Sequence, residues 1–229
     1  MRVSNHALIC DCDGVLIDSE AIAAQMLVHE LELRWPDADV APVLMPLLGM
    51  RTEHVLDATA AHLERTLSAA DIEAIREAVS AGAMEAPLVE GIVTALGEIP
   101  LQKACASNSN TAYVQAVLAR TGLVEFFGDR VFCADSVALP KPAPDVYLAA
   151  ARGLNLTPDA CLVVEDSVTG VSAASAAGMT VIGFIGGGHA NEAQIEALRA
   201  AGAVHVFDDM RQLPGFVTQW MERVAIGSH

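Results

Sequence analysis

Ala-Leu-Ile-Cys-Asp-Cys-Asp-Gly-Val-Leu-Ile-Asp-Ser-Glu, residues 7–20, is the stretch of sequence that decides the fold. Its first four residues, Ala7 to Cys10, form a short apolar run, which is typical of a strand buried on both faces of a parallel sheet. Two carboxylates, Asp11 and Asp13, follow this run, and Gly14 comes after them. Because ligands of open α/β sheets bind just past the carboxyl ends of the strands, we expect chemistry at these two acids.

Two simpler interpretations leave part of this stretch unexplained. Asp and Gly tolerate turn geometry, so an ordinary strand-to-turn sequence accounts for one acid and for Gly14, but not for the whole string. A calcium loop of the EF-hand type has acids at its first, third and fifth positions, Gly at the sixth and Glu at the twelfth. Here Gly is fourth and the flank is a strand. Two acids at this spacing can instead approach one hard cation through their oxygen atoms.

Strand-like and helical patterns alternate in the second part of the chain, which predicts a parallel sheet with right-handed crossovers. The predicted strands are Gln102–Ser107, Arg130–Ala134, Ala160–Glu165, Met179–Ile185 and Val204–Phe207. Helical patterns cover 110–121, 143–153, 168–177 and 210–224.

Residues 18–87 have helical spacing and no strand-like run. Helices are predicted at 18–35, 39–47, 51–66 and 68–84, the last with Ser68 as its N-cap. We therefore predict an α/β fold: a Rossmann-like parallel-sheet core formed by 1–17 and 88–226, with an all-helical cap domain at 18–87 inserted into it.

Composition narrows the classes of function. The chain has 229 residues, of which 53% are hydrophobic, and it can bury a large core. A net charge of −16 argues against nucleic acid and anionic membrane surfaces as partners. The start has too few apolar residues for a signal peptide, and no apolar run has the roughly 18 residues of a transmembrane helix. Five cysteines without a CxxC pair indicate reduced, structural thiols and a cytoplasmic protein. The sequence leaves the oligomeric state open, with a monomer favoured.

Three further segments carry polar groups at strand ends or before helices. Ser107-Asn108-Ser109 ends a predicted strand and opens a helix, where backbone N–H groups suit a phosphate, although Ser and Asn also cap helices without any ligand. Lys141, one of two lysines in the chain, lies between prolines that stiffen its loop; the alternative is a solvated lysine. Lys103, the other lysine, begins a strand and is expected at the surface.

Glu165 and Asp166 are adjacent acids at a strand's carboxyl end, and such a pair is costly without a cation. A Mg²⁺ ion shared with Asp11 resolves this cost, and octahedral Mg²⁺ keeps several water ligands.

These segments, in this order and spacing, resemble the four motifs of the haloacid dehalogenase-like (HAD) superfamily, in the β-phosphoglucomutase-like branch of small-molecule phosphatases. The resemblance covers essentially the whole chain, since that branch has a cap at the same point. It implies that Asp11 is the nucleophile and Asp13 the general acid/base. It further implies that Lys141 holds the nucleophile and the phosphoryl group together, and that Ser107 and the Asn108 amide bind phosphate.

By the same resemblance, Asp11, Asp13, Asp166 and Glu165 form the metal site, with Glu165 acting directly or through water. The expected activity is a Mg²⁺-dependent hydrolysis of a small phosphorylated metabolite, a sugar phosphate or sugar-acid phosphate, through an aspartyl-phosphate. The chain departs from β-phosphoglucomutases at Ala23, where those enzymes carry a histidine.

Two other functions stay open. One is a hexose phosphate mutase of the β-phosphoglucomutase type, and the other is a non-catalytic protein that binds a phosphorylated ligand. Two features remain without a firm role. Arg51 is a candidate for substrate contact from the cap, but a solvated arginine at a helix start explains it equally well. Gly186-Gly187-Gly188-His189 lacks the Lys-Ser/Thr of a P-loop and is interpreted as a flexible loop, with His189 a weak candidate.

Overall fold

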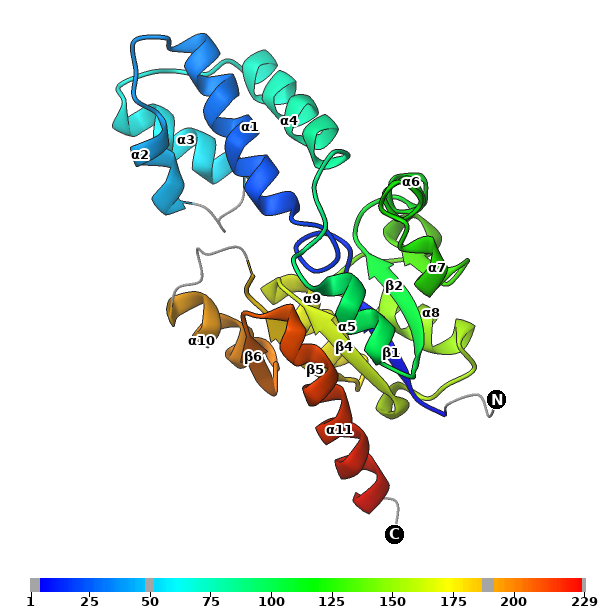
Figure 1. Ribbon diagram of the computed structural model, residues 1–229. Coiled ribbons are helices and arrows are strands. Elements are labelled where there is room, and N and C mark those ends of the chain that lie inside the picture. Colours follow the sequence, from blue (N-terminus) through cyan, green and yellow to red (C-terminus); the bar gives the residue numbers. More distant parts are fainter. Residues whose placement is uncertain (1–4, 48–51, 187–191, 228–229) are drawn as a thin grey trace. The chain divides into compact units, whose positions relative to one another are not determined.

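The computed structural model of the chain describes residues 5–47, 52–186 and 192–227. Two compact units make up the chain: Met1–Asp18 with Pro87–His229, and Ser19–Ala86. The chain leaves the first unit and returns to it at adjacent points, because the Asp18 backbone N–H donates to the Pro87 carbonyl at 2.8 Å. The second unit is thus an insertion into the first, and we describe each by itself (Figure 1).

The first unit contains a six-stranded sheet with the order β3-β2-β1-β4-β5-β6, and every neighbouring pair is parallel. The strands are β1 (Ala7–Cys10), β2 (Gln102–Ser107), β3 (Val131–Cys133), β4 (Cys161–Glu165), β5 (Thr180–Phe184) and β6 (His205–Phe207). This sheet confirms the predicted α/β, Rossmann-like fold class. Successive connections run to β2 and β3 on one side of β1 and to β4, β5 and β6 on the other, and ligands of such sheets bind where this order reverses.

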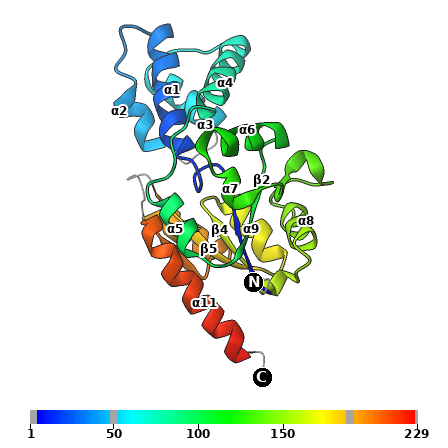
Figure 2. The same cartoon turned by 45° about the vertical axis from the view of Figure 1, so that its right-hand side comes forward.

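Helices cover the sheet of this unit (Figures 1 and 2). They are α5 (Ile92–Glu98), α6 (Thr111–Thr121), α7 (Val124–Phe127), α8 (Asp145–Gly153), α9 (Val168–Ala176), α10 (Glu192–Ala201) and α11 (Leu213–Gly227). Alternate strand residues such as Ile9 and Val163 pack with Val146 of α8, Val171 of α9 and Leu198 of α10 in one buried cluster. The side chains of β1 are buried on both faces of the sheet, as its continuous apolar run predicts.

The second unit is all helical in its described part. It comprises α1 (Ser19–Arg34), α2 (Ala41–Leu44), a 3₁₀ turn at Met45–Leu47, α3 (Thr52–His62) and α4 (Ala69–Ala83). Leu31 of α1, Leu56 of α3 and Ile75 of α4 meet in a separate hydrophobic core. Ser68 caps α4 as predicted, and its hydroxyl accepts a hydrogen bond from the Asp71 N–H while the Asp71 carboxylate accepts one from the Ser68 N–H.

The structure differs from the sequence-based expectation at three helices and at one lysine. Helices α5, α7 and α10 were not predicted. Segments of 7 and 4 residues, as in α5 and α7, are too short to show a helical period, whereas the 10 residues of α10 were missed. Lys103 is buried rather than at the surface, and its ammonium donates to the carbonyls of Ile99 at 2.7 Å and Leu101 at 3.1 Å.

In the part of the chain that the structure describes, no helix is long and apolar enough to cross a membrane.

Candidate active site

Asp11 directly follows β1, the strand between β2 and β4 in the sheet. Its backbone N–H donates to the Val164 carbonyl at 3.1 Å and so continues the hydrogen bonding between β1 and β4. Ser107 ends β2 and Glu165 ends β4. Because the three strands are parallel and adjacent, their carboxyl ends bring residues from distant parts of the sequence to one edge of the sheet.

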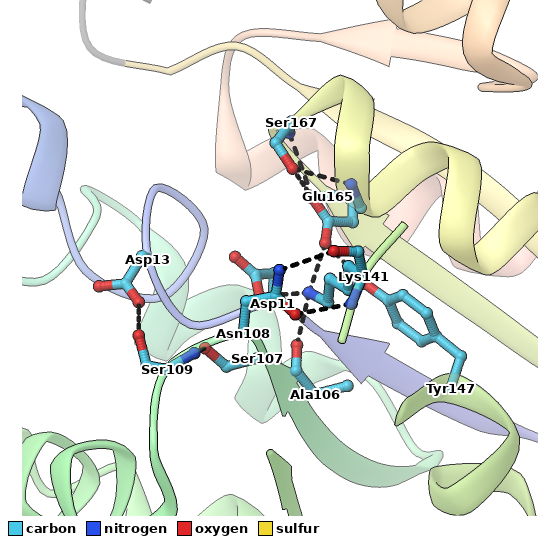
Figure 3. A network of polar contacts seen from close by, with 11 residues as sticks. Asp11, Asp13, Ala106, Ser107, Asn108, Ser109, Lys141, Tyr147, Glu165 and Ser167 are labelled. Atoms are coloured by element: carbon cyan, nitrogen blue, oxygen red, sulfur yellow. Dashed lines mark hydrogen bonds and ion pairs between the residues drawn. The ribbon is translucent and has the colours of Figure 1, made fainter. Parts of the chain in front are cut away.

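Lys141 is the centre of this group of residues (Figure 3). Its ammonium donates to Asp11 Oδ1 at 2.7 Å, to Glu165 Oε1 at 2.6 Å and to the Ala106 carbonyl at 2.9 Å, and its side chain is 3% exposed. Asn108 fixes the lysine backbone, because its Oδ1 accepts from the Lys141 N–H at 2.8 Å and its Nδ2 donates to the Lys141 carbonyl at 3.1 Å. The lysine predicted from its proline-flanked loop is therefore a buried partner of two carboxylates.

The carboxylate of Glu165 is fully buried, and both of its oxygens have protein donors. Oε1 accepts from Lys141 and from the Tyr147 hydroxyl at 2.7 Å. Oε2 accepts from the backbone N–H of Ser167 at 3.2 Å and from its hydroxyl at 3.0 Å. Glu165 thus links Lys141 to the start of α9, where Ser167 is the N-cap.

Three acids lie close enough to share one cation. One oxygen from each of Asp11, Glu165 and Asp166 lies within 4.8 Å of the others. Lys141 supplies one positive charge against these three carboxylates. Burial raises the pKa of Asp11 to about 7; Lys141 opposes this shift, while Glu165 and Asp13 add to it. Three carboxylate oxygens this close together fit a hard divalent cation such as Mg²⁺.

Two glycines leave room for these acids. Gly14 has φ +79°, and a β-carbon there would overlap the Asp166 carboxylate. A β-carbon at Gly170, in α9, would overlap the Glu165 carboxylate. Gly14 of the first motif and Gly170 of the fourth are thus required for steric reasons, because a larger residue at either position would displace one of the acids.

Asp13 lies outside the group of three acids and has different partners. Its Oδ2 accepts from the Ser109 hydroxyl at 2.9 Å, and its Oδ1 accepts from the Tyr113 hydroxyl at 2.9 Å. Figure 3 shows Asp13 and Ser109 to one side of the Asp11–Lys141–Glu165 group. Among the described residues, the Asp13 carboxylate is thus not part of the group of three acids that could share a cation, and its predicted role as a metal ligand stays a prediction.

The remaining predicted residues fall into two groups. Ser107 is buried, and its hydroxyl accepts from the Ser109 N–H at 3.0 Å, which turns the backbone at the end of β2. Arg51, residues 187–188 and His189 lie outside the described residues, so the interpretations of Arg51 and of the glycine-rich loop stay predictions.

Two tyrosines of the site, Tyr113 and Tyr147, were missed by the sequence analysis. Tyr113 contacts Asp13, whereas Tyr147 donates to Glu165 and has its ring 4.9 Å from the Lys141 ammonium. They are the two tyrosines of the chain. The scarcity that singles out Lys141 applies to them equally, and it is the signal that could have pointed to them.

Comparison with known proteins decides the family. The family model described as haloacid dehalogenase-like hydrolase matches residues 6–178, which is more than half of the chain. The protein is a haloacid dehalogenase-like hydrolase. The recognition made from the motifs is thereby confirmed, and the match includes every described residue of the site.

Similar proteins include named phosphatases of Escherichia coli. Fructose-1-phosphate phosphatase is 31% identical over 76% of this chain and 94% of its own length. 6-Phosphogluconate phosphatase is 26% identical over 80% of this chain and 84% of its own length. Among solved structures, a HAD family hydrolase from Deinococcus radiodurans, with bound phosphate and sodium, is 29% identical with a TM-score of 0.78 and covers 94% of this chain and 96% of its own.

Proposed function

We propose that this HAD-like hydrolase is a Mg²⁺-dependent phosphatase that cleaves a small phosphorylated metabolite through an aspartyl-phosphate on Asp11. The observation that carries the proposal is the buried contact between Asp11 and Lys141, beside three acids whose oxygens lie close enough to share one cation. A carboxylate in this setting is a nucleophile held in place, and the lysine beside it can neutralise charge on a phosphoryl group. Asp13, two residues further on, is a separate acid for proton transfer.

The proposed reaction has two steps. An Asp11 oxygen attacks phosphorus in line and forms the acyl-phosphate, while the bond to the leaving oxygen breaks and Asp13 gives that oxygen its proton. In the second step Asp13 takes a proton from water as the water oxygen attacks phosphorus, and the Asp11 carboxylate is released with inorganic phosphate. Lys141 stays beside the transferring group in both steps.

Asn108 has a second part in this proposal. Its side chain is committed to the Lys141 backbone, so its backbone N–H is the group proposed for phosphate binding, together with the Ser107 hydroxyl. Placing both residues at the end of β2 puts them on the same sheet edge as Asp11.

The metal would be held by Asp11 and Asp166, with Glu165 acting through water, because the Glu165 oxygens already accept from protein donors. A bound Mg²⁺ ion supplies positive charge that balances the phosphoryl oxygens and the surrounding carboxylates. Burial raises the pKa of Asp11, and a bound cation would favour its ionised form, which supports this proposal.

The proposed substrates are sugar phosphates and sugar-acid phosphates. Two similar Escherichia coli proteins are phosphatases of fructose 1-phosphate and 6-phosphogluconate, which supports this class of substrate. The net charge of −16 supports a small ligand rather than nucleic acid or an anionic membrane, because local cations must overcome the overall field.

We further propose that the helical unit acts as the cap that selects the substrate. The chain enters this unit directly after the loop that carries Asp11 and Asp13, which supports such a role. A closing cap also keeps water from a charged reaction centre.

The test of this proposal is phosphate release. With Mg²⁺, the protein should hydrolyse p-nitrophenyl phosphate, and a panel of phosphorylated sugars and sugar acids should contain a substrate of higher kcat/KM. Binding of those ligands without any phosphate release would favour the non-catalytic alternative and overturn the proposal.

A further inference from the structure

Each oxygen of the Asp13 carboxylate accepts a hydrogen bond from a neutral hydroxyl. Tyr113 donates to Oδ1 and Ser109 donates to Oδ2, both at 2.9 Å. The reaction proposed above uses Asp13 for proton transfer but gives neither hydroxyl a part in it. Ser109 precedes α6 and Tyr113 lies in its first turn, so one short segment supplies both donors.

This segment is itself fixed to the sheet. The Ser109 N–H donates to the hydroxyl of Ser107, the last residue of β2, at 3.0 Å. The Tyr113 N–H donates to the side chain of Asn110, the N-cap of α6, at 2.9 Å. Because β2 lies beside β1, the two hydroxyls reach Asp13 from the neighbouring strand end and the helix that follows it.

The chemistry of these partners suits a group that gains and loses a proton. A hydroxyl rotates and can either donate or accept, so it pairs with a carboxylate and also with a carboxylic acid. An ammonium or guanidinium donates only and would favour the ionised form. Asp11 has an ammonium as its partner, whereas Asp13 has two hydroxyls. The two acids of one loop are thus held in surroundings that match their separate roles as nucleophile and acid/base.

We propose that Tyr113, together with Ser109, is a positioning residue that fixes the orientation of Asp13 for proton transfer to the leaving oxygen. This inference rests on the proposed phosphatase function. Proton transfer needs the acid within hydrogen-bond reach of the leaving oxygen, and a carboxylate that is free to turn spends less time there. Loss of either hydroxyl should therefore slow the reactions in which the leaving group needs a proton.

Two substrates of similar shape separate this effect from a general loss of activity. Phenyl phosphate releases a basic phenolate that benefits from protonation, whereas p-nitrophenolate is a stable leaving group. The kcat/KM values report the step in which Asp11 is phosphorylated and the leaving group departs, not the later attack of water. For Tyr113→Phe we expect kcat/KM for phenyl phosphate to fall about tenfold or more, and kcat/KM for p-nitrophenyl phosphate to stay within about twofold.

Three further variants complete the experiment. Ser109→Ala should give the same selective loss as Tyr113→Phe, because it removes the donor to the other oxygen of Asp13. Tyr147→Phe is the matched control: it removes the hydroxyl of the other tyrosine, which donates to Glu165, and should lower kcat/KM for both substrates by the same factor. Asp13→Asn sets the largest selective loss that misplacement of this acid can produce. Thermal unfolding of each variant gives its folded fraction.

A selective loss in Tyr113→Phe and Ser109→Ala, absent from Tyr147→Phe, supports the inference. An equal loss on both substrates, no loss, or faster hydrolysis of phenyl phosphate by Tyr113→Phe overturns it while the phosphatase function stands. If the wild-type protein hydrolyses neither ester with Mg²⁺, the proposed function fails and the inference fails with it.

Discussion

The ammonium of Lys141 lies 2.7 Å from Oδ1 of Asp11, although 130 positions separate the two residues in the sequence. Both are almost fully buried. Such a pair costs desolvation energy, and its attraction compensates for that cost only with good geometry and further hydrogen bonds. Here Ala106 and Glu165 provide the further acceptors for the lysine. The pair lies at the carboxyl end of β1, where open α/β sheets bind ligands, and this place fits the catalytic role proposed for it.

Asp11→Asn should abolish turnover while the protein stays folded. The amide has nearly the same volume as the carboxylate, but it does not form the acyl-phosphate. Phosphate release should fall below about one hundredth of the wild-type rate, measured on fresh protein whose mass rules out deamidation. A higher residual rate contradicts the assignment of the nucleophile.

The same substitution should change how stability depends on pH in metal-free protein. Burial raises the pKa of Asp11 from 3.8 to about 7. The folded state therefore keeps a proton that the unfolded chain releases, and stability falls as pH rises from about 4 to 7 and is then level. In EDTA, Asp11→Asn should raise Tm more at pH 8 than at pH 5. The two increases should differ by several degrees, since a change of 1 kcal/mol in the free energy of unfolding shifts the Tm of a chain of this size by about 2–4 °C. An equal Tm difference at both pH values contradicts the raised pKa of Asp11.

Metal removal should abolish the catalytic activity of the protein. EDTA should stop phosphate release and Mg²⁺ should restore it, whereas Ca²⁺ should be a poor substitute because its larger, looser coordination shell spoils the in-line geometry. Full activity in chelator would refute the metal role of Asp166.

A pair of variants then separates the adjacent acids. Asp166→Asn should raise the Mg²⁺ concentration for half-maximal activity about tenfold or more, because it removes a direct ligand. Glu165→Gln should raise it less and lower kcat instead, since Glu165 accepts from Lys141, Tyr147 and Ser167. The reverse order of the two Mg²⁺ effects would show that Glu165 is the direct ligand.

Gly170→Ala should destabilise the protein and lower its activity, although alanine is the better helix former. A β-carbon at this position of α9 would overlap the Glu165 carboxylate, which is fully buried and held by four hydrogen bonds. Gly97→Ala in α5 is the matched control, because a β-carbon there meets no described atom within 4 Å. We expect it to be neutral or to add up to about 1 kcal/mol to the free energy of unfolding. Denaturant titration of both variants tests the contrast, and equal effects would contradict it.

The residues at strand ends could be predicted because strand, turn and residue type all point to the same edge of the sheet. Asp11, Ser107 and Glu165 follow buried apolar runs, and parallel pairing brings such ends together. The side-chain partners could not be predicted in this way. Tyr113 and Tyr147 lie on helices, and which face of a helix meets a carboxylate depends on packing that a helical period does not specify.

Lys103 shows the same limit from the opposite direction. A lysine at the start of a strand has no local sign of burial, and its ammonium is satisfied by the carbonyls of Ile99 and Leu101 at a bend before β2.

Glu165 was expected to bind the metal directly or through water. Four hydrogen bonds from protein donors already occupy its oxygens, and this observation supports the second of these two proposals.

The last prediction separates a phosphatase from a mutase. Both form the aspartyl-phosphate, but a mutase must exclude water and hold a bisphosphate for the return transfer, which takes cationic groups in the cap. Residues 18–87 contain no lysine, and position 23 is alanine. In the helical unit, Arg34 pairs with Glu30 and Asp71, Arg65 with Asp37, and Arg76 with Glu53, so these three arginines already have carboxylate partners.

We therefore predict net hydrolysis: inorganic phosphate should accumulate from a sugar phosphate, and no isomerised sugar phosphate should form. Arg51, the fourth arginine of residues 18–87, lies outside the described residues and stays the predicted candidate for substrate contact. Arg51→Ala should raise KM for the sugar phosphate and leave p-nitrophenyl phosphate nearly unaffected, since the small ester needs no contact with the cap. Arg65→Ala is the matched control. The exposed ion pair between Arg65 and Asp37 contributes little to stability, so this variant should stay folded and leave the KM of both substrates unchanged. Isomerisation of β-glucose 1-phosphate that is faster than phosphate release would show a mutase, because the phosphoryl group would then return to sugar more often than it passes to water.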